Sequence, residues 1–140
     1  MKFIYSQINP DKLLHMIHKV DEFKDLEDIN RKDLVPEKEF IQLSALNLPK
    51  GRTFRPHQHV WKPGEEQCIS QESWVVIKGR VECRFYDTNG DFLDNPILES
   101  GDCSITLEGG HNYFILEDDT LVYEYKTGPY EGQQRDKVFG

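Results

Sequence analysis

The chain has 140 residues, a formal net charge of −8, and a composition that is 37% hydrophobic and 30% charged, which is typical of one globular domain. The acidic charge excludes a general nucleic-acid binder, which needs a basic face to neutralise phosphates. No apolar run approaches the roughly 20 residues of a membrane-spanning helix, and the first residues lack the apolar stretch and cleavage site of a signal peptide. We therefore expect a cytoplasmic protein with no nucleic-acid and no membrane partner.

Residues 10–28 have the pattern of an amphipathic helix. Pro10 and Asp11 are typical of a helix start. The apolar residues that follow recur at three- and four-residue steps and would form one stripe: Leu13, Leu14, Ile17, Val20 and Phe23. We therefore expect residues 1–39 to form a short N-terminal helical extension.

From Phe40 onward the sequence predicts a β-domain over residues 40–140. Short apolar segments alternate with turns that contain Gly, Asn, Asp or Pro. The clearest hairpin is RVECRFYDTNGDFL, residues 80–93, in which apolar and polar residues alternate up to the Thr88-Asn89-Gly90 turn. Many short strands without helices between them favour an antiparallel sandwich or barrel.

Two histidines near the start of this β-domain indicate a metal site. His57 and His59 are two residues apart, so that on an extended strand both imidazoles lie on the same face. Glu72 opens the next predicted strand and can supply a carboxylate oxygen. Glu65 and Glu66 are alternatives to Glu72 as the carboxylate ligand.

A third histidine follows a second segment that is rich in turn residues. Gly101-Asp102 is typical of a turn, a strand follows, and a Glu108-Gly109-Gly110 turn places His111 at the start of another strand. Three imidazoles and one carboxylate suit Zn, Fe, Ni or Mn rather than Ca or Mg. We predict one divalent transition-metal ion held by four ligands: His57, His59, Glu72 and His111.

The spacing of these residues resembles the two sequence motifs of the cupin superfamily. The first motif is G-x5-H-x-H followed by E-x6-G, and its positions are occupied by Gly51, His57, His59, Glu72 and Gly79. The second motif, G-x9-H here, ends at His111, with Leu107 in the place of the family's proline. The gap between the histidine pair and the glutamate is also longer than is usual in the family. The resemblance implies a mainly β protein: a small cupin (jelly-roll) β-barrel with the helical extension before it.

The C-terminal part resembles the WbuC family of cupin-fold metalloproteins more closely. That family carries a histidine, a strand, an E-x-K-x-GPY element and a terminal DK. The matching residues are Glu124, Lys126, Gly128, Pro129, Tyr130, Asp136 and Lys137. The likeness covers residues 40–139 and implies a metal-binding cupin of the kind found among polysaccharide and lipopolysaccharide biosynthesis proteins, with no settled reaction.

Strand alternation extends the predicted site beyond the metal ligands. If the ligands point inward, Arg55, Trp74 and Tyr113 should point inward as well. A guanidinium, an indole and a phenol beside a metal suit an anionic or sugar-like ligand. The alternative is that the two aromatic rings only fill the barrel and that the arginine reaches only its rim.

Three functions fit such a site. The first is a metal-dependent isomerase, lyase or dioxygenase that acts on a sugar or a small polar acid. The second is a non-catalytic module that binds a carbohydrate or another small ligand beside a structural metal. The third is a metal-free sugar isomerase or epimerase in which His57 or His59 transfers protons. For the assembly we expect a homodimer, with the segment before Phe40 covering a sheet edge or exchanging with a neighbour.

Overall fold

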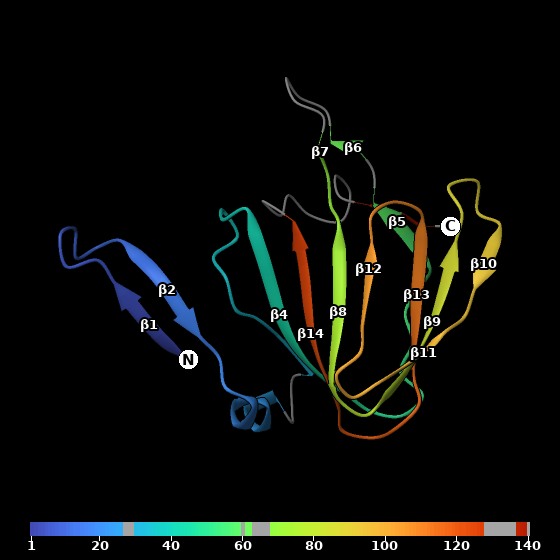
Figure 1. Cartoon of the computed structure of the whole chain (residues 1–140), viewed down its shortest axis with the longest axis horizontal. Helices are drawn as coiled ribbons and strands as arrows, with labels where there is room; N and C mark the ends of the chain where they lie inside the picture. The colour runs from blue at the N-terminus through green and yellow to red at the C-terminus, as the bar shows by residue number, and fades with distance from the viewer. Residues whose placement is uncertain (27–29, 60, 63–67, 128–136, 140) are drawn as a thin grey trace.

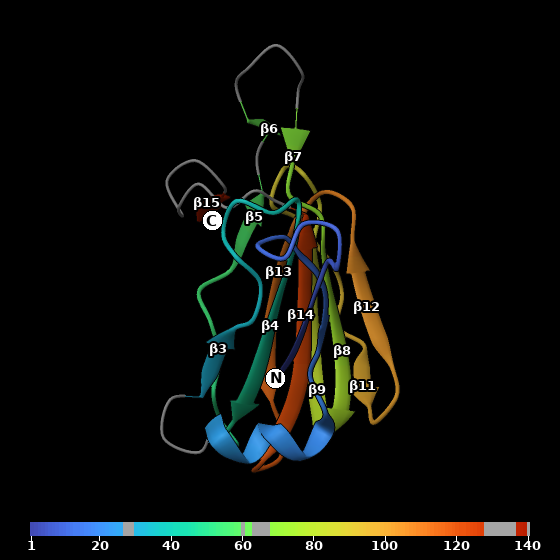
Figure 2. The same ribbon diagram turned by 90° about the vertical axis from the view of Figure 1, so that its left-hand side faces the viewer.

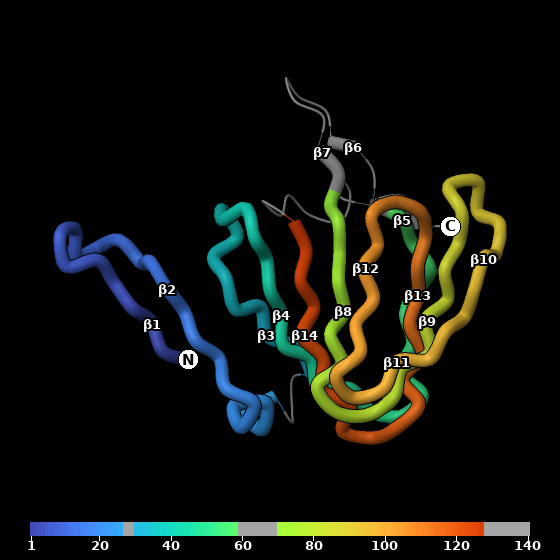
Figure 3. Tube along the Cα trace, viewed as in Figure 1, coloured from blue at the N-terminus to red at the C-terminus, as the bar shows by residue number. Residues whose placement is uncertain are grey.

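The computed structural model describes residues 1–26, 30–59, 61–62, 68–127 and 137–139, and these residues are mainly β-structure (Figures 1 and 3). Among them, no helix has the length and apolar character that crossing a membrane requires. A 3-10 helix, η1, spans Val20–Leu26. Most of the strands belong to two antiparallel sheets that face each other.

The first sheet has five strands in the order β12-β8-β14-β4-β3. Their bounds are β12 Cys103–Thr106, β8 Glu72–Lys78, β14 Thr120–Thr127, β4 Ile41–Leu48 and β3 Arg31–Asp33. The second sheet has six strands in the order β10-β9-β13-β5-β15, with β11 also paired to β9. Their bounds are β10 Phe92–Asp94, β9 Arg80–Tyr86, β13 Gly110–Ile115, β5 His57–His59, β15 Lys137–Phe139 and β11 Ile97–Glu99. A short separate pair consists of β6 Trp61–Lys62 and β7 Cys68–Ile69.

Over the described residues the two large sheets form an open sandwich and not a closed barrel, so the expected barrel is a looser arrangement than its name implies (Figure 1). The mainly β architecture predicted from the sequence is confirmed. The hairpin over residues 80–93 is confirmed as β9 and β10, in which Tyr86 lies opposite Phe92.

Side chains of both sheets meet in one apolar core. Along β8 the burial alternates, so that Glu72, Trp74 and Val76 point between the sheets. The apolar residues of this core are Leu46, Leu48, Trp74, Val76, Val81, Cys83, Leu98, Tyr113, Ile115 and Val122.

The interior changes from apolar to polar along the strands. In β14, Val122 lies opposite Leu46 and Val76, whereas Glu124 lies opposite Ser44 and Trp74. Because antiparallel pairing places these residues in common rows, buried polar side chains of several strands gather at one end of the sandwich.

The helix predicted over residues 10–28 is wrong for its first half. β1 (Lys2–Tyr5) and β2 (Leu13–Ile17) form an antiparallel hairpin, and of the residues described between 10 and 26 only Val20–Leu26 is helical. The Ser6 hydroxyl accepts hydrogen bonds from the backbone N–H groups of Ile8 and Asn9 and so favours a turn there. The apolar spacing also fits a strand in part, because Leu13 and Ile17 stand at alternate positions of β2.

The helical turn packs on the outer face of the five-stranded sheet. Phe23 and Leu26 are each 1% exposed and cluster with Leu34 and Ala45. The hairpin that precedes them stands beside β4 in Figure 1 and in front of the sheet in Figure 2. The N-terminal segment therefore covers part of this face through η1.

Gly79 carries the chain from one sheet to the other, between β8 and β9. Its φ angle is +102°, which residues with a side chain rarely adopt. A Cβ atom at this position would lie 2.9 Å from the Cβ and 3.0 Å from the Cα of Thr120. Since Thr120 is fully buried, this neighbour has little room to move.

We expect Gly79→Ala to lower the free energy of unfolding by about 3 kcal/mol, because backbone strain and overpacking both act there. Gly90→Ala is the matched control, since φ is +91° but nothing lies within 4 Å of the added methyl group. For the control we expect a loss of about 1 kcal/mol. Urea unfolding of both variants measures the difference, and equal losses would contradict the role of Thr120.

Candidate metal centre

Two histidines of the six-stranded sheet face each other across adjacent strands. His57 in β5 lies directly opposite His111 in β13, and their Nε2 atoms are 3.1 Å apart. Pro56 precedes the first strand and disfavours a helix there, and the turn at Gly109 and Gly110 starts the second. His111 is completely buried, whereas His57 is half-buried.

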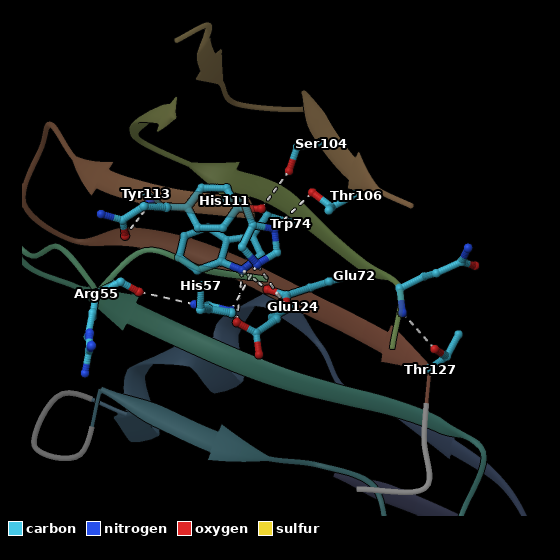
Figure 4. A network of polar contacts seen from close by, with 12 residues as sticks. Arg55, His57, Glu72, Trp74, Ser104, Thr106, His111, Tyr113, Glu124 and Thr127 are labelled. Atoms are coloured by element: carbon cyan, nitrogen blue, oxygen red, sulfur yellow. Dashed lines mark hydrogen bonds and ion pairs between the residues drawn. The ribbon is translucent and has the colours of Figure 1, made fainter. Parts of the chain in front are cut away.

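The carboxylate of Glu72 approaches the same point from the other sheet. Its Oε2 atom lies 3.5 Å from His111 Nε2, and the residue is only 6% exposed (Figure 4). One donor atom from each of His57, Glu72 and His111 lies within 4.8 Å of the others. Three of the four predicted ligands therefore offer atoms that converge.

These three residues fit a divalent transition metal. Ligand atoms at 2.0–2.2 Å from a tetrahedral zinc ion are about 3.4 Å apart, close to the 3.1 and 3.5 Å contacts found. His57 Nδ1–H donates to the Arg55 carbonyl at 3.2 Å, so the lone pair of its Nε2 faces the other two residues. His111 Nδ1 shares a hydrogen bond of 2.9 Å with the Thr106 hydroxyl, which fixes the ring.

The fourth predicted ligand lies at the margin of the described structure. The backbone of His59 belongs to β5 and pairs with Lys137 of β15, but its side chain lies outside the described residues. Glu65 and Glu66, the alternative carboxylates, lie outside them as well.

A cavity of about 380 Å³ opens between the sheets at this polar end. His57 and Glu72 line it together with Trp74 and Tyr113. The two aromatic rings stack in parallel, with centroids 3.8 Å apart and an interplanar angle of 7°. They are also members of the apolar core, so both interpretations from the sequence describe them: they fill the interior and they form a wall of the cavity.

Arg55 does not line this cavity and its side chain is exposed (Figure 4). Residues 54–56 are not part of a strand, so alternation back from His57 does not hold there, and Phe54 is the residue that turns inward. Among the described residues, the cationic side chains that line the cavity are Arg31, Arg52 and Lys126.

A second buried carboxylate, Glu124, joins the network and was missed from the sequence as a site residue. It accepts hydrogen bonds from Trp74 Nε1–H at 2.9 Å and from Arg31 Nη2 at 2.8 Å. Burial alone would lower the pKa of Arg31, but the carboxylates of Glu124 and Asp33 outweigh it and raise that pKa. Alternation along the predicted strand LVYEYK would have turned Glu124 and Lys126 to one face, which was the available signal.

Tyr113 remains a neutral phenol in this setting. Burial, and after it the negative charge of Glu72, raise the pKa of Tyr113 well above its ordinary value. Its hydroxyl shares a hydrogen bond of 3.1 Å with Ser104. The residue therefore contributes a fixed aromatic surface and a polar edge rather than a charge.

Comparison with solved structures places the fold. KdgF from a Halomonas species has a TM-score of 0.55 and 22% identity, over 72% of this chain and 80% of that chain. An uncharacterized protein with a double-stranded β-helix domain from Klebsiella pneumoniae has a TM-score of 0.58 and 16% identity, over 89% of this chain and 90% of that chain. CapF, a capsular polysaccharide assembling protein from Staphylococcus aureus, has a TM-score of 0.60 and 19% identity, over 80% of this chain but only 32% of that chain.

No protein-family profile matches the chain, and no curated protein matches it in sequence. Identities of 22% and below establish the fold and not a shared activity. The chain has the double-stranded β-helix fold of cupin proteins, with a His-Glu-His group that could hold a metal ion.

Proposed function

We propose that the chain is a metalloprotein that uses one divalent transition-metal ion, Zn, Fe, Ni or Mn, on a small polar, anionic or sugar-like molecule. His57, Glu72 and His111 would hold the ion, with His59 as a further ligand. The observation that carries the proposal is the convergence of the three described ligands, two of which, His57 and Glu72, line the 380 Å³ cavity.

The protein's own residues would bind and orient the molecule. When bound, a metal ion of this kind supplies Lewis acidity or lowers the pKa of a coordinated water. The stack of Trp74 and Tyr113 offers a flat wall, and aromatic faces pack well against sugar rings. Arg52 lies at the cavity with its guanidinium 5.2 Å from the Phe54 ring and can pair with a carboxylate or phosphate.

A place in polysaccharide metabolism rests on two likenesses. The E-x-K element shared with the WbuC family supplies Glu124 and Lys126, and both line the cavity. The remaining residues of that resemblance up to Asp136 lie outside the described part of the chain. CapF is by name a capsular polysaccharide assembling protein. The WbuC resemblance and the sugar substrate are part of the proposal.

The first test measures the metal. We expect purified protein to hold about one transition-metal ion per chain by elemental analysis, and His111→Ala to lose it, because a central ligand is removed. His15→Ala is the control, since this histidine is exposed on β2.

Metal should also raise the melting temperature of the wild-type chain and not that of His111→Ala. Equal metal content in both variants would contradict the site, and a metal-free wild type that converts sugars would favour the isomerase or epimerase alternative.

The second test addresses the ligand and the distinction between an enzyme and a binding module. Metal-loaded protein is incubated with a panel of sugar nucleotides and sugar acids, and products are sought by mass spectrometry. We expect turnover that is lost in His57→Ala. Binding of the anionic sugar compound should be roughly 10-fold weaker in Arg52→Ala, because a charge-assisted hydrogen bond is removed. Arg55→Ala, outside the cavity, is the control. Thermal protection without turnover would support the module instead.

We also propose that the chain forms a homodimer through its N-terminal hairpin. A two-stranded hairpin alone is marginally stable in water, and this one exposes several large apolar residues: Phe3, Ile4, Tyr5, Ile8, Leu14 and Ile17. Residues 1–19 carry three lysines against the single acid Asp11, whereas the whole chain has a net charge of −8. The rest of a second copy carries the opposite charge, and its exposed apolar residues can pack against those of this hairpin.

Light scattering tests the dimer. We expect the wild type to have twice the mass of one chain, and Phe3→Ser/Tyr5→Ser to shift toward the monomer, because the apolar contact is lost. Phe92→Ser/Leu93→Ser is the control, since these residues of β10 are similarly exposed at 57% and 59%. A wild-type monomer, or equal dissociation of both variants, would refute the hairpin interface.

A further inference from the structure

We propose that Glu124 is a positioning residue for the metal ligand Glu72 and acts on it through the indole N–H of Trp74. The proposal rests on the metal site proposed above and deepens it, because it names the side chains that set the direction of the carboxylate ligand. The three residues lie side by side at the polar end of the sandwich (Figure 4).

Two buried carboxylates share the single N–H group of one indole. Trp74 Nε1–H donates to Glu72 Oε1 at 3.1 Å and to Glu124 Oε2 at 2.9 Å. The exposed fractions of the two glutamates are only 6% and 8%. Because an indole has one hydrogen to donate, a change at one acceptor alters the hydrogen bond at the other.

The two oxygens of Glu72 have different partners. Oε1 accepts from the indole, and Oε2 is the oxygen that lies 3.5 Å from His111 Nε2. The carboxylate is thereby oriented toward the histidines before any ion binds. Partners that orient a ligand in this way are typically worth 10–100-fold in metal affinity.

Glu124 is itself held at both oxygens. Its Oε1 accepts from Arg31 Nη2 at 2.8 Å, while Oε2 accepts from the indole. The same Arg31 nitrogen donates to the Ser44 hydroxyl at 3.1 Å, and Ser44 donates to Asp33 at 2.6 Å. This series of hydrogen bonds therefore extends from the edge strand β3 across β4 and β14 to Trp74.

The indole ring cannot turn away from this position easily. It stacks on Tyr113, whose hydroxyl is bonded to Ser104, and Phe54 contacts it edge-on with centroids 5.8 Å apart. Trp74 is 2% exposed. The ring therefore keeps its N–H between the two carboxylates, and both depend on the same donor.

Competition with a chromophoric chelator measures the effect on zinc or cobalt affinity. We expect Trp74→Phe, which keeps the aromatic stack and removes the N–H, to weaken metal binding at least 10-fold. Glu124→Gln should weaken it about 10-fold, because the amide has one acceptor oxygen for two donors, so that its NH2 group faces either Arg31 or the indole N–H and disturbs the shared contact. The control is Glu99→Gln, since Glu99 is an exposed carboxylate that pairs with Arg80 at 3.4 Å outside the cavity; we expect no change there.

A double-mutant cycle separates positioning from a general loss of stability. If Glu124 acts through Trp74, Glu124→Gln should cost less than about 3-fold in the Trp74→Phe background. Equal costs in both backgrounds, or an affinity of Glu124→Gln equal to that of Glu99→Gln, would overturn the proposal.

A measurement on metal-free protein gives an independent readout. The chain has two tryptophans, so Trp74→Phe assigns the Trp74 indole N–H signal in an NMR spectrum. We expect Glu124→Gln to move this signal and Glu99→Gln to leave it unchanged; an unmoved signal in Glu124→Gln would count against the shared hydrogen bond. If the wild type binds no ion that depends on His111, the metal site itself fails. If the wild type binds metal and Glu124→Gln binds equally well, only the positioning role fails.

Discussion

The strand register in the middle of the five-stranded sheet is the constraint on which the site depends. β14 pairs with β8 on one side and with β4 on the other, so Glu124 lies opposite both Trp74 and Ser44. Lys126 lies opposite Glu72 and Gln42 in the same way. A shift of one residue in β14 would turn its inward side chains to the opposite face of the sheet. The polar end of the sandwich exists only in this register.

The apolar end keeps that register in place. Val122, Leu46 and Val76 are at most 2% exposed and pack against residues of the facing sheet such as Val81 and Ile115. Burial of such side chains favours one alignment of the strands, because any slip exposes the whole row to water. The fold thus divides its interior: one half supplies the free energy that fixes the strands, and the other half holds charged groups that bring little stability themselves.

The sequence predicted the parts of the site that depend on local pattern. His57, Glu72 and His111 were identifiable because each stands at or near the start of a short strand next to turn residues, and the structure brings them together. The helix over residues 10–28 failed because its apolar spacing also fits a hairpin, and the choice between them depends on the turn near Ser6. The contact between Arg31 and Glu124 joins residues 93 positions apart, so no local pattern contains it. Register between distant strands decides such pairs.

The hydrogen bonds at their Nδ1 atoms leave the Nε2 atoms of His57 and His111 able to bind an ion. The Nε2 atoms of His57 and His111 are 3.1 Å apart, so without an ion one of them must carry a proton toward the other. His57 already donates from Nδ1 to a carbonyl, so a proton on its Nε2 would make the ring a cation. A proton on His111 Nε2 would instead require Thr106 to donate to Nδ1. A hydroxyl can donate such a hydrogen bond, so the pair is also satisfied as neutral rings. A divalent ion would take both Nε2 lone pairs and the nearby Glu72 oxygen as ligands, with the Thr106 hydroxyl accepting from His111 Nδ1 instead. The hydrogen bonds at the two Nδ1 atoms are compatible with the tautomers that a metal selects.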